Sequence, residues 1–520
     1  MDQQSLFWAD ATAREVVEAW KADRYRTEMG MGASGVPHIG SVGDGVRSYA
    51  VALGIRSLGK ESELIAYSDD RDGLRKVPQG FPSSLEKELG KPVSSIPDPF
   101  GCHRSFALHV SSLLVEAFER LGVQFTLHRG SEEYQQGTLD REIETILKHA
   151  KRAGEIVKET TGSEKFLEAL PFLAVCAACG RIYTTRALSY EKGKVRYVCD
   201  QEFIGKAGNR QVALQGCGFQ GEASIREGKL AWKVEFAARW KALDIHFEAY
   251  GKDILDSVRC NDAICRELLG REPPVHAFYE LFTERGGQKL SKSKGNVFTP
   301  QTWMTLGSPE SLRLLFLKRL GTSRVVDEDA IPALMDEVDE LGKVYRGEIR
   351  EPNKRELAHK KRLFEYVHSL QPAPPGFPVA YTAAVNLARC FPPRARERAM
   401  KEILLGTQVP GPQALQDLER RIQYASRFAG EEPPARGKVE LDAHERKALL
   451  DLADALKTLK EADQIQDRIF EIAKARGLRP GDFFKILYKV LIGLERGPRA
   501  GRLIELLGPQ DARTLLKDRA

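Results

Sequence analysis

Short apolar runs alternate with amphipathic helical stretches through the first 160 residues of the chain. ELIAYS and GVQFTLH have the length of buried strands, and the stretches SFALHVSSLLVEAFERLG and DREIETILKHAKRAGEIV suit helices. Strands that alternate with helices are joined by crossovers and pair in parallel. The sequence therefore predicts an α/β domain with a parallel sheet.

The pattern changes twice further along the chain. Residues 171–228 gather Gly, Cys and β-type residues and indicate a small insertion, after which helix and sheet patterns resume at 229. From about residue 305 the chain is almost wholly helical by pattern. Linkers or long turns are expected at 371–378 and 430–438, because clustered prolines disfavour both helix and strand.

Composition sets limits on compartment and partners. The chain has no membrane-length apolar run and no basic-then-apolar start, so we expect a cytoplasmic protein without a membrane span. A net charge of +6 fits a polyanionic partner without requiring one. Eight cysteines in that compartment are expected as metal ligands or buried thiols.

A glycine-rich turn is the first candidate phosphate site. Ser34, Gly35, His38, Gly40 and Ser41 lie just before an apolar helical pattern. Such a turn can direct backbone N–H groups at a phosphate, and His38 can donate a hydrogen bond to a phosphoryl oxygen as charge builds on it. Taken alone, an ordinary strand-to-helix turn with a surface histidine explains the pattern equally well.

A lysine-rich segment about 250 residues later is the second candidate. KLSKSKGN at 289–296 contains Lys289, Ser291, Lys292 and Ser293 at spacings that no single helical face needs. A mobile loop of this kind can close over a triphosphate and neutralise the leaving pyrophosphate. The alternative is a solvated basic loop that contacts RNA.

Together, these segments resemble the HIGH and KMSKS signatures of class I aminoacyl-tRNA synthetases, at His38–Ser41 and Lys289–Ser293. Ser41 stands where the first signature has its second histidine. Within that class the chain resembles the class I lysyl-tRNA synthetases over nearly its whole length. The stretches that carry this resemblance are AYSDDRDGLRKVP (66–78), WKVEFAARW (232–240), FEAYGKD (247–253), FYELF (278–282) and LIGLERGPRAGRLIELLG (491–508).

The resemblance implies an architecture and an activity. It implies a Rossmann-type catalytic domain at 1–170 and 229–300 around the insertion at 171–228, a stem-contact region at 301–350 and an all-α anticodon-binding domain at 351–520. The implied reaction joins lysine to ATP as lysyl-adenylate, releases pyrophosphate, and transfers the lysyl group to the terminal adenosine of the tRNA. ATP with Mg²⁺, lysine and tRNA(Lys) are the implied partners, and we expect a monomer.

Glu28 is the residue expected to make the amino-acid pocket select lysine over glutamate. Glutamyl and glutaminyl synthetases, which resemble this family, carry a carboxylate-binding arginine ten residues before the signature histidine. Ten residues before His38 this chain has Glu28, whose charge would repel glutamate and suit an ammonium group. Glu28 could equally be a strand-end residue that faces water.

Four further site residues are implied by the same resemblance. Asp253 is expected to bind the ribose hydroxyls of ATP, with a structural ion pair as the alternative, and the lysine pocket is expected to contain Gly30, Trp232 and Tyr279. Either aromatic ring could instead belong to the core. The chain departs from many family members at Gly32, where they have threonine, and at Ile254, where they have histidine.

Four cysteines of the insertion have the spacing of a metal site. Cys176 and Cys179 form a CxxC pair, and Cys199 and Cys217 follow after 19 and 17 residues. Four thiolates can close a structural tetrahedral zinc site, with buried or redox thiols as the alternative. The other cysteines lie on apolar patterns and are expected in the core: Cys102, Cys260, Cys265 and Cys390.

Two other functions remain open at this point. One is a catalytically silent RNA-binding or regulatory relative, and the other is a synthetase paralogue that charges another amino acid or acceptor. The intact His38 and Lys289–Ser293 argue against the first. The helical C-terminal region argues against the second, although a plain helical bundle explains its periodicity as well as an anticodon-binding domain does.

Overall fold

The chain divides into two compact units. The structure, a computed structural model, describes residues 7–283, 298–406, 409–430, 439–493, 495, 497 and 499–520. The N-terminal unit comprises Met1–Met304, Pro309–Glu328 and Val344–Pro372, and the C-terminal unit comprises Thr305–Ser308, Asp329–Lys343 and Ala373–Ala520. The predicted domain boundary at 350 therefore does not coincide with the change of unit near residue 372.

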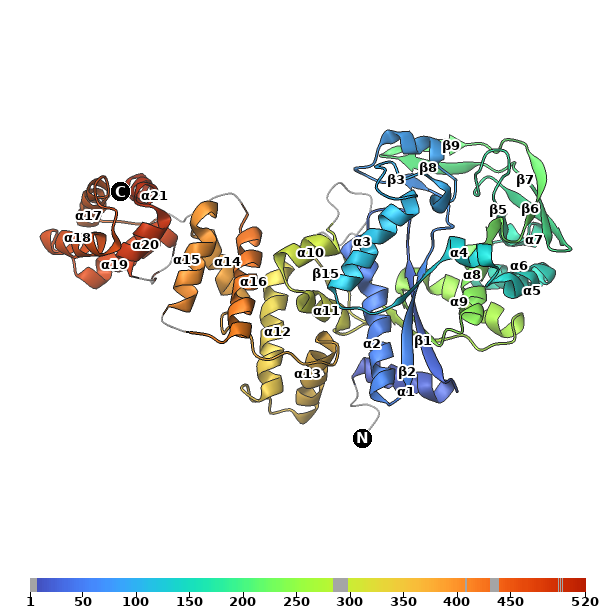
Figure 1. Cartoon of the computed structure of the whole chain (residues 1–520), viewed down its shortest axis with the longest axis horizontal. Coiled ribbons are helices and arrows are strands. Elements are labelled where there is room, and N and C mark those ends of the chain that lie inside the picture. The colour runs from blue at the N-terminus through green and yellow to red at the C-terminus, as the bar shows by residue number, and fades with distance from the viewer. Residues whose placement is uncertain are drawn as a thin grey trace. The chain divides into compact units, whose positions relative to one another are not determined.

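A parallel sheet of five strands forms the centre of the N-terminal unit (Figure 1). In spatial order the strands are β13 (Val275–Tyr279), β12 (Phe247–Gly251), β1 (Arg24–Met31), β2 (Glu61–Ser68) and β4 (Thr126–Arg129). The chain adds strands first on the β2 side of β1 and later on its β12 side, so the winding reverses at β1. Ligands of open parallel sheets bind at the carboxyl ends of the strands beside such a reversal. The predicted α/β sheet is confirmed, and by this rule its ligands are expected at the carboxyl ends of β1 and its neighbours, which we call the ligand edge.

Helix α2 (Gly43–Ser57), which follows β1, is buried on nearly all sides. Gly45 permits this packing, because a Cβ there would lie 2.3 Å from Met29 Sδ and 2.4 Å from a ring carbon of Phe118. The short 3₁₀ helix η2 (Ile39–Val42) joins β1 to α2, so this close packing also fixes the turn that carries His38. The other helices contained in this unit are α1 (Trp8–Ala19), η3 (Ser83–Glu88), η4 (Val93–Ser95), α3 (Phe106–Arg120), α4 (Gly130–Gln136), α5 (Asp140–Lys148), α6 (Ala150–Thr161), α7 (Lys165–Glu168), α8 (Trp232–Ala242), η5 (Lys252–Ile254), α9 (Leu255–Glu267), α11 (Pro309–Leu317) and α13 (Lys354–Val367).

The insertion begins and ends on two paired strands. β5 (Phe172–Ala174) and β11 (Gly228–Leu230) pair antiparallel and form its neck. Beyond the neck, β6 (Arg186–Glu191), β7 (Lys194–Val198) and β10 (Gln220–Ser224) form one sheet, while β8 (Phe203–Ala207) and β9 (Arg210–Leu214) join β3 (Lys76–Val77) in another. Because β3 belongs to the segment after β2, the insertion is tied to the loop at the ligand edge of the central sheet.

The rest of the chain is mainly helical, as predicted. The short strands β14 (Phe282–Thr283) and β15 (Arg324–Val325) pair in the N-terminal unit. Residues 371–378 are irregular as expected, whereas most of the predicted turn at 430–438 lies outside the described residues. The helices that cross between units or form the C-terminal unit are α10 (Pro300–Leu306), α12 (Ala330–Arg346), α14 (Tyr381–Arg389), α15 (Pro393–Leu405), α16 (Pro412–Phe428), α17 (Ala443–Ala455), α18 (Ala462–Ala475), α19 (Pro480–Ile492), α20 (Ala500–Leu507) and α21 (Pro509–Arg519).

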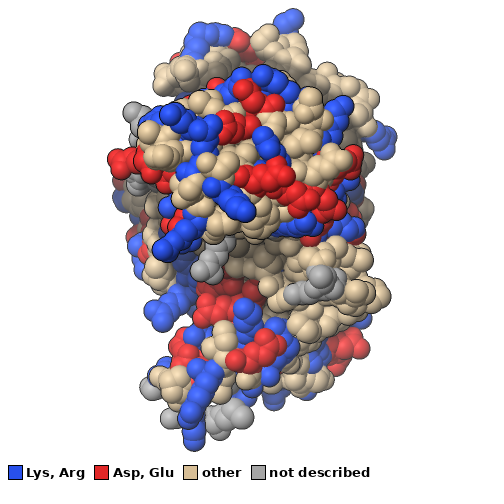
Figure 2. Space-filling view, turned by 90° about the vertical axis from the view of Figure 1, so that its left-hand side faces the viewer, with Lys and Arg blue, Asp and Glu red and all other residues tan. Residues whose placement is uncertain are grey.

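Surface charge does not by itself mark a partner on the C-terminal helices. On the face that Figure 2 shows, Lys and Arg side chains alternate with Asp and Glu side chains and form no continuous basic area. A mixed surface of this kind is compatible with nucleic acid but does not require it. Among the described residues, no helix combines the length and apolar character needed to cross a membrane.

Candidate functional site

The turn around His38 fixes the position of this histidine through contacts with Ser41. His38 precedes η2, its backbone N–H donates to Ser41 Oγ at 3.2 Å, and its ring Nδ1 lies 3.5 Å from the same oxygen. Gly40 is required here, because a Cβ at this position would lie 3.0 Å from His38 Cε1 and 3.1 Å from Nδ1. Ser41 therefore holds the histidine, and Gly40 leaves room for its ring. Of the other predicted residues, Ser34 is exposed and Gly35 is buried.

The first described residue after the lysine-rich segment, Phe298, contacts this turn. The backbone N–H of Ile39 donates to the carbonyl of Phe298 at 2.8 Å, and Phe298 directly follows the residues that are not described. Two segments separated by more than 250 residues thus meet beside His38. The predicted ATP-binding residues of the second segment lie outside the described residues: Lys289, Ser291, Lys292 and Ser293.

Tyr279 lies beside the predicted ribose residue. A Cβ on Gly251 would lie 2.8 Å from Asp253 Oδ1 and 3.6 Å from Tyr279 Cε2, so both side chains crowd this glycine. The hydroxyl of Tyr279 donates to Asp44 Oδ1, and the Arg47 guanidinium lies 3.7 Å from the ring centroid. Burial raises the pKa of Asp44 to about 7, against the hydrogen bond from Tyr279 and the charge of Arg47, which lower it. The hydroxyl of Tyr279 therefore contacts Asp44, and its ring contacts Arg47.

Glu28 does not face water, so the alternative reading of this residue was wrong. It lies within β1, is 0% exposed, and is in register with Glu248 of β12. Its Oε1 lies 2.5 Å from Nε of Arg239, in an ion pair without hydrogen-bond alignment. Burial raises the pKa of Glu28, while the charge of Arg239 opposes that rise.

Arg239, on α8, binds carboxylates from three strands or strand ends. Besides Glu28, its Nη1 donates to Asp69 Oδ1 at 3.2 Å and its Nη2 donates to Glu248 Oε1 at 3.4 Å. The second oxygen of Glu248 accepts from the indole of Trp240 at 2.5 Å. Arg239 is 1% exposed, so three acids and one guanidinium share a buried site with too few cations. Burial accordingly raises the pKa of Asp69 to about 7, against the charge of Arg239.

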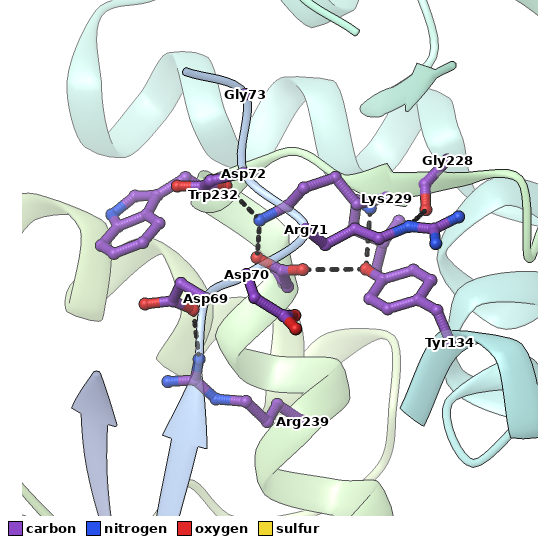
Figure 3. A network of polar contacts seen from close by, with 12 residues as sticks. Asp69, Asp70, Arg71, Asp72, Gly73, Tyr134, Gly228, Lys229, Trp232 and Arg239 are labelled. Atoms are coloured by element: carbon purple, nitrogen blue, oxygen red, sulfur yellow. Dashed lines mark hydrogen bonds and ion pairs between the residues drawn. The ribbon is translucent and has the colours of Figure 1, made fainter. Parts of the chain in front are cut away.

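A second buried cation, Lys229 of β11, continues these contacts. It is 2% exposed and forms ion pairs with Asp72 at 2.5 Å and with Glu235 at 2.6 Å. The Tyr134 hydroxyl donates to the other oxygen of Glu235 at 2.9 Å. Figure 3 shows Arg239 directed at Asp69 and Lys229 directed at Asp72 from opposite sides of one loop. We call this set the acidic network; its members are Glu28, Asp69, Asp72, Glu235 and Glu248 with Arg239 and Lys229.

The predicted lysine-pocket residues separate into two groups. Gly30 lies at the network, since a Cβ there would be 3.9 Å from Asp69 Oδ2. Trp232 begins α8, next in the chain to the neck strand that carries Lys229, and its ring packs 4.6 Å from the ring of Phe236. Tyr279 belongs with Asp44 instead. The structure thus brings Glu28 and Gly30 together around Asp69.

Sequence reasoning missed Asp69, Arg239, Glu248 and Lys229. Asp69 and Arg239 lie within the stretches AYSDDRDGLRKVP and WKVEFAARW, which carried the family resemblance. The available signal was Arg239 among the apolar residues of the stretch AARW in α8, because a charge on a buried face needs a partner. Nothing local in the sequence says which partner it is.

The four cysteines of the insertion meet as predicted. Sγ of Cys176 lies 3.6 Å from Sγ of Cys217, and Sγ of Cys179 lies 3.8 Å from Sγ of Cys199. In a tetrahedral zinc site with Zn–S bonds of about 2.3 Å, sulfur atoms are separated by about 3.8 Å. The donor set and its spacing therefore fit a structural zinc ion.

A second group of possible metal ligands was not predicted. It spans the segment before α3 and the first turn of that helix. Its ligand atoms lie within 4.8 Å of one another, and its members are Asp98, Cys102, His103 and His109. Sγ of Cys102 lies 3.1 Å from Nδ1 of each histidine. The expectation that Cys102 belongs to the core was wrong, because its residue is exposed, whereas Cys260, Cys265 and Cys390 are buried as expected. The mixed sulfur, nitrogen and oxygen donors suit zinc.

Comparison with known proteins assigns the chain to a family. Residues 6–370 match the family model described as tRNA synthetases class I (K), and residues 412–518 match an anticodon binding domain. A lysine–tRNA ligase of Cenarchaeum symbiosum (strain A) is 44% identical over 523 residues, which cover 98% of each chain. A lysine–tRNA ligase of Haloarcula marismortui is 32% identical, over 96% of this chain and 95% of that one. A glutamate–tRNA synthetase structure from Elizabethkingia anophelis matches with a TM-score of 0.43 and 14% identity, over 95% of this chain and 99% of that one.

Proposed function

The chain belongs to the class I tRNA synthetases of the lysine type, and from this premise we propose that it is an ATP-dependent lysine–tRNA ligase. It activates lysine with ATP and transfers the lysyl group to tRNA. The observation that carries this conclusion is the 44% identity to a lysine–tRNA ligase over 98% of both chains, since it includes the catalytic and the anticodon-binding regions.

The first step of the reaction is assigned to the turn at His38. The lysine carboxylate attacks the α-phosphorus of ATP, and pyrophosphate leaves. His38, held by Ser41 and backed by Gly40, donates to a phosphoryl oxygen whose negative charge grows in the transition state. Asp253 binds the ribose hydroxyls, and Lys289 and Lys292 neutralise the pyrophosphate. This chemistry depends on positioning and charge rather than on a protein nucleophile.

Lysine selection is assigned to the Glu28 side of the sheet edge. A glutamate side chain would bring another carboxylate to a buried site in which three acids already share Arg239. Burying an additional unpaired anion there is strongly unfavourable, whereas an ammonium group reduces the excess of negative charge. Gly30 leaves space for the side chain, and the Trp232 ring is proposed to line its aliphatic part.

Two metals and a tRNA-binding region belong to the same proposal. Zinc occupies the four-cysteine site and stabilises the insertion, and Mg²⁺ accompanies the ATP triphosphate. The C-terminal helices bind the anticodon stem of tRNA(Lys), in keeping with the anticodon-domain match at 412–518. We further propose that the protein acts as a monomer in the cytoplasm.

Attachment of labelled lysine to tRNA tests the function. Purified protein with ATP, lysine and tRNA(Lys) should form lysyl-tRNA, and omission of ATP should abolish it. His38→Ala should lower kcat/KM by about 100- to 1,000-fold, as expected when a donor to a developing anion is removed. Charging with a different amino acid, or no charging at all, would refute the proposal.

A further inference from the structure

Asp69 connects the acidic network to the ligand edge of the sheet. It is the first residue after β2, and its backbone N–H donates to the Met31 carbonyl at the end of β1 at 2.9 Å. Its Oδ1 accepts from Arg239 at 3.2 Å, while its Oδ2 lies 3.9 Å from where a Cβ on Gly30 would stand. One carboxylate oxygen is thus held by the protein and the other is turned to the pocket position at Gly30.

The charges of the acidic network do not balance within it. Five carboxylates share two cations, Arg239 and Lys229, in a region where Asp72 is the most exposed member. The Tyr67 hydroxyl is an independent sign of an incomplete site, because it is buried at 1% exposure and has no hydrogen-bond partner among the described residues. Its ring lies under Arg239, 4.5 Å from the guanidinium carbon. Buried acceptors in excess of donors favour the binding of a cation.

The loop that carries Asp69 is held from the insertion side as well. Lys229 pairs with Asp72, and Arg71 donates to the carbonyl of Gly228 at 3.2 Å, so both contacts join this loop to neck strand β11 (Figure 3). The Tyr183 hydroxyl accepts from the backbone N–H of Gly73 at 3.1 Å. With Arg239 on one side and the neck on the other, the Asp69 carboxylate is preorganised rather than free to turn away.

We propose that Asp69 is a further specificity-determining residue, which binds an ammonium group of the substrate beside Gly30, with Arg239 and Lys229 as positioning residues. This inference rests on the proposed function, because it takes lysine as the amino acid. Lysine carries two ammonium groups and one carboxylate, so its net positive charge reduces the negative excess of the network. An amino acid with an acidic side chain increases that excess and is rejected.

The substitution Asp69→Asn tests this role, because the amide is close in shape and its oxygen can still accept from Arg239. In ATP–pyrophosphate exchange, we expect the KM for lysine to rise by about 10- to 100-fold, which is the range for loss of a charge-assisted hydrogen bond. The KM for ATP and the melting temperature should stay close to those of the wild type. Asp140→Asn, which removes the partner of Arg226 in a surface ion pair, is the matched control and should change neither KM.

Two lysine analogues show which amine Asp69 binds. As inhibitors of exchange, 6-aminohexanoate lacks the α-amine and norleucine lacks the ε-amine. The analogue that lacks the Asp69-bound amine should inhibit wild type and Asp69→Asn equally, and the other should lose potency in the variant. If Asp69→Asn does not fold, Asp69→Ser replaces it, with the same rise in lysine KM expected.

Three results would decide against the inference. A lysine KM within twofold of the wild type would overturn the role of Asp69 while leaving the proposed function intact. A parallel rise in both KM values with a lower melting temperature would indicate a structural residue instead. Absence of lysine-dependent exchange in the wild type, both with and without tRNA(Lys), would refute the proposed function itself, and with it the inference.

Discussion

Two buried arginines, one in each unit, show how the same residue type can serve different ends. Arg421 of α16 is clamped within the C-terminal unit: Nη1 and Nη2 donate to the two oxygens of Asp339 at 2.7 and 2.6 Å, and Nε donates to Asp417 at 2.8 Å. Arg239 of the N-terminal unit has three carboxylate partners, and its 2.5 Å contact with Glu28 lacks hydrogen-bond alignment.

The two sites differ in whether the N–H donors of the arginine satisfy the carboxylate oxygens around it. At Arg421, a bidentate pair and one further bond use the donors in good geometry, as in a structural clamp. At Arg239, acceptors outnumber donors, and the hydroxyl of nearby Tyr67 has no hydrogen-bond partner within the described part of the chain. A buried charge cluster that is satisfied stabilises a fold, whereas one that stays incomplete without ligand marks a binding site.

The largest expected effect separates stability from binding. Arg421→Met leaves two partly buried carboxylates, Asp339 and Asp417, without their cation and should lower the free energy of unfolding of the C-terminal unit by about 3 kcal/mol. The KM for lysine in the exchange reaction of the folded protein should not change. Chemical denaturation and exchange kinetics measure the two quantities. Arg420→Met is the control, because the neighbouring Arg420 side chain is 60% exposed and its loss should cost under about 1 kcal/mol.

The pH dependence of lysine binding tests whether the site of Arg239, unlike that of Arg421, binds a ligand. The pKa of Asp69 is raised to about 7 by burial, so its carboxylate is mostly protonated at pH 6 and mostly ionised at pH 8. An ammonium ligand prefers the ionised form, so the KM for lysine should fall by about tenfold as the pH rises across this range. The groups that face Asp69 are Glu28 on β1, Glu248 on β12, Arg239 and Glu235 on α8, Lys229 on β11 and Asp72 on its own loop.

Asp69→Asn provides the control for this titration. Without the carboxylate, the dependence of the lysine KM on pH should flatten. Asp44, whose pKa is also about 7, lies on the Tyr279 side, so the KM for ATP is not a neutral reference here. A profile that is unchanged in Asp69→Asn would assign the titration to another group and weaken the contrast between the two arginines.

Removal of metal should affect one arginine cluster and not the other. Cys199→Ser breaks the four-cysteine site, and should loosen the neck through which Lys229 holds Asp72. We expect the KM for lysine to rise about threefold, which corresponds to a loss of less than about 1 kcal/mol of binding free energy. Unfolding of the C-terminal unit should not change. Metal analysis should give a zinc ion in the wild-type chain that is lost in Cys199→Ser. A second zinc ion that is lost in Cys102→Ser would show that Asp98, Cys102, His103 and His109 also bind zinc, whereas an unchanged zinc content in Cys102→Ser would exclude it there.

The smallest expected effect comes from an exposed pair near the network. Arg226 and Asp140 pair on the surface, where side-chain exposures are 48% and 27%. Arg226→Ala should change the free energy of unfolding by at most about 1 kcal/mol, because exposed ion pairs are screened by water. Differential scanning calorimetry measures this. If Arg226→Ala lowered the free energy of unfolding as much as Arg421→Met does, buried and exposed ion pairs would not differ in their contribution to stability.

The sequence was most informative where the signal is local. The parallel sheet was predictable because the alternation of strands and helices is written in successive residues, and the four-cysteine cluster followed from a CxxC pair with two further cysteines. The His38–Ser41 turn was also identified from one short stretch, although nothing in that stretch shows that the Phe298 carbonyl meets Ile39.

Long-range charge pairing was not predictable from the same sequence. Asp69 and Arg239 are 170 residues apart, and only the folded sheet brings them together. Glu28 illustrates the limit: its position suggested contact with an ammonium group, but its burial and its pairing with Arg239 depend on β1 lying between β2 and β12. The second metal cluster was not predicted for a different reason: the spacing of Asp98, Cys102, His103 and His109 contains no CxxC pair, and only the fold at the start of α3 brings the four side chains together.

Amino-acid-dependent exchange of labelled pyrophosphate into ATP tests the central claim most directly. It is run with each standard amino acid in turn, with and without tRNA(Lys). We predict exchange with lysine and a far lower rate with every other amino acid, glutamate included. Exchange driven by another amino acid, or none under either condition, would contradict the assignment of this chain as a lysine–tRNA ligase.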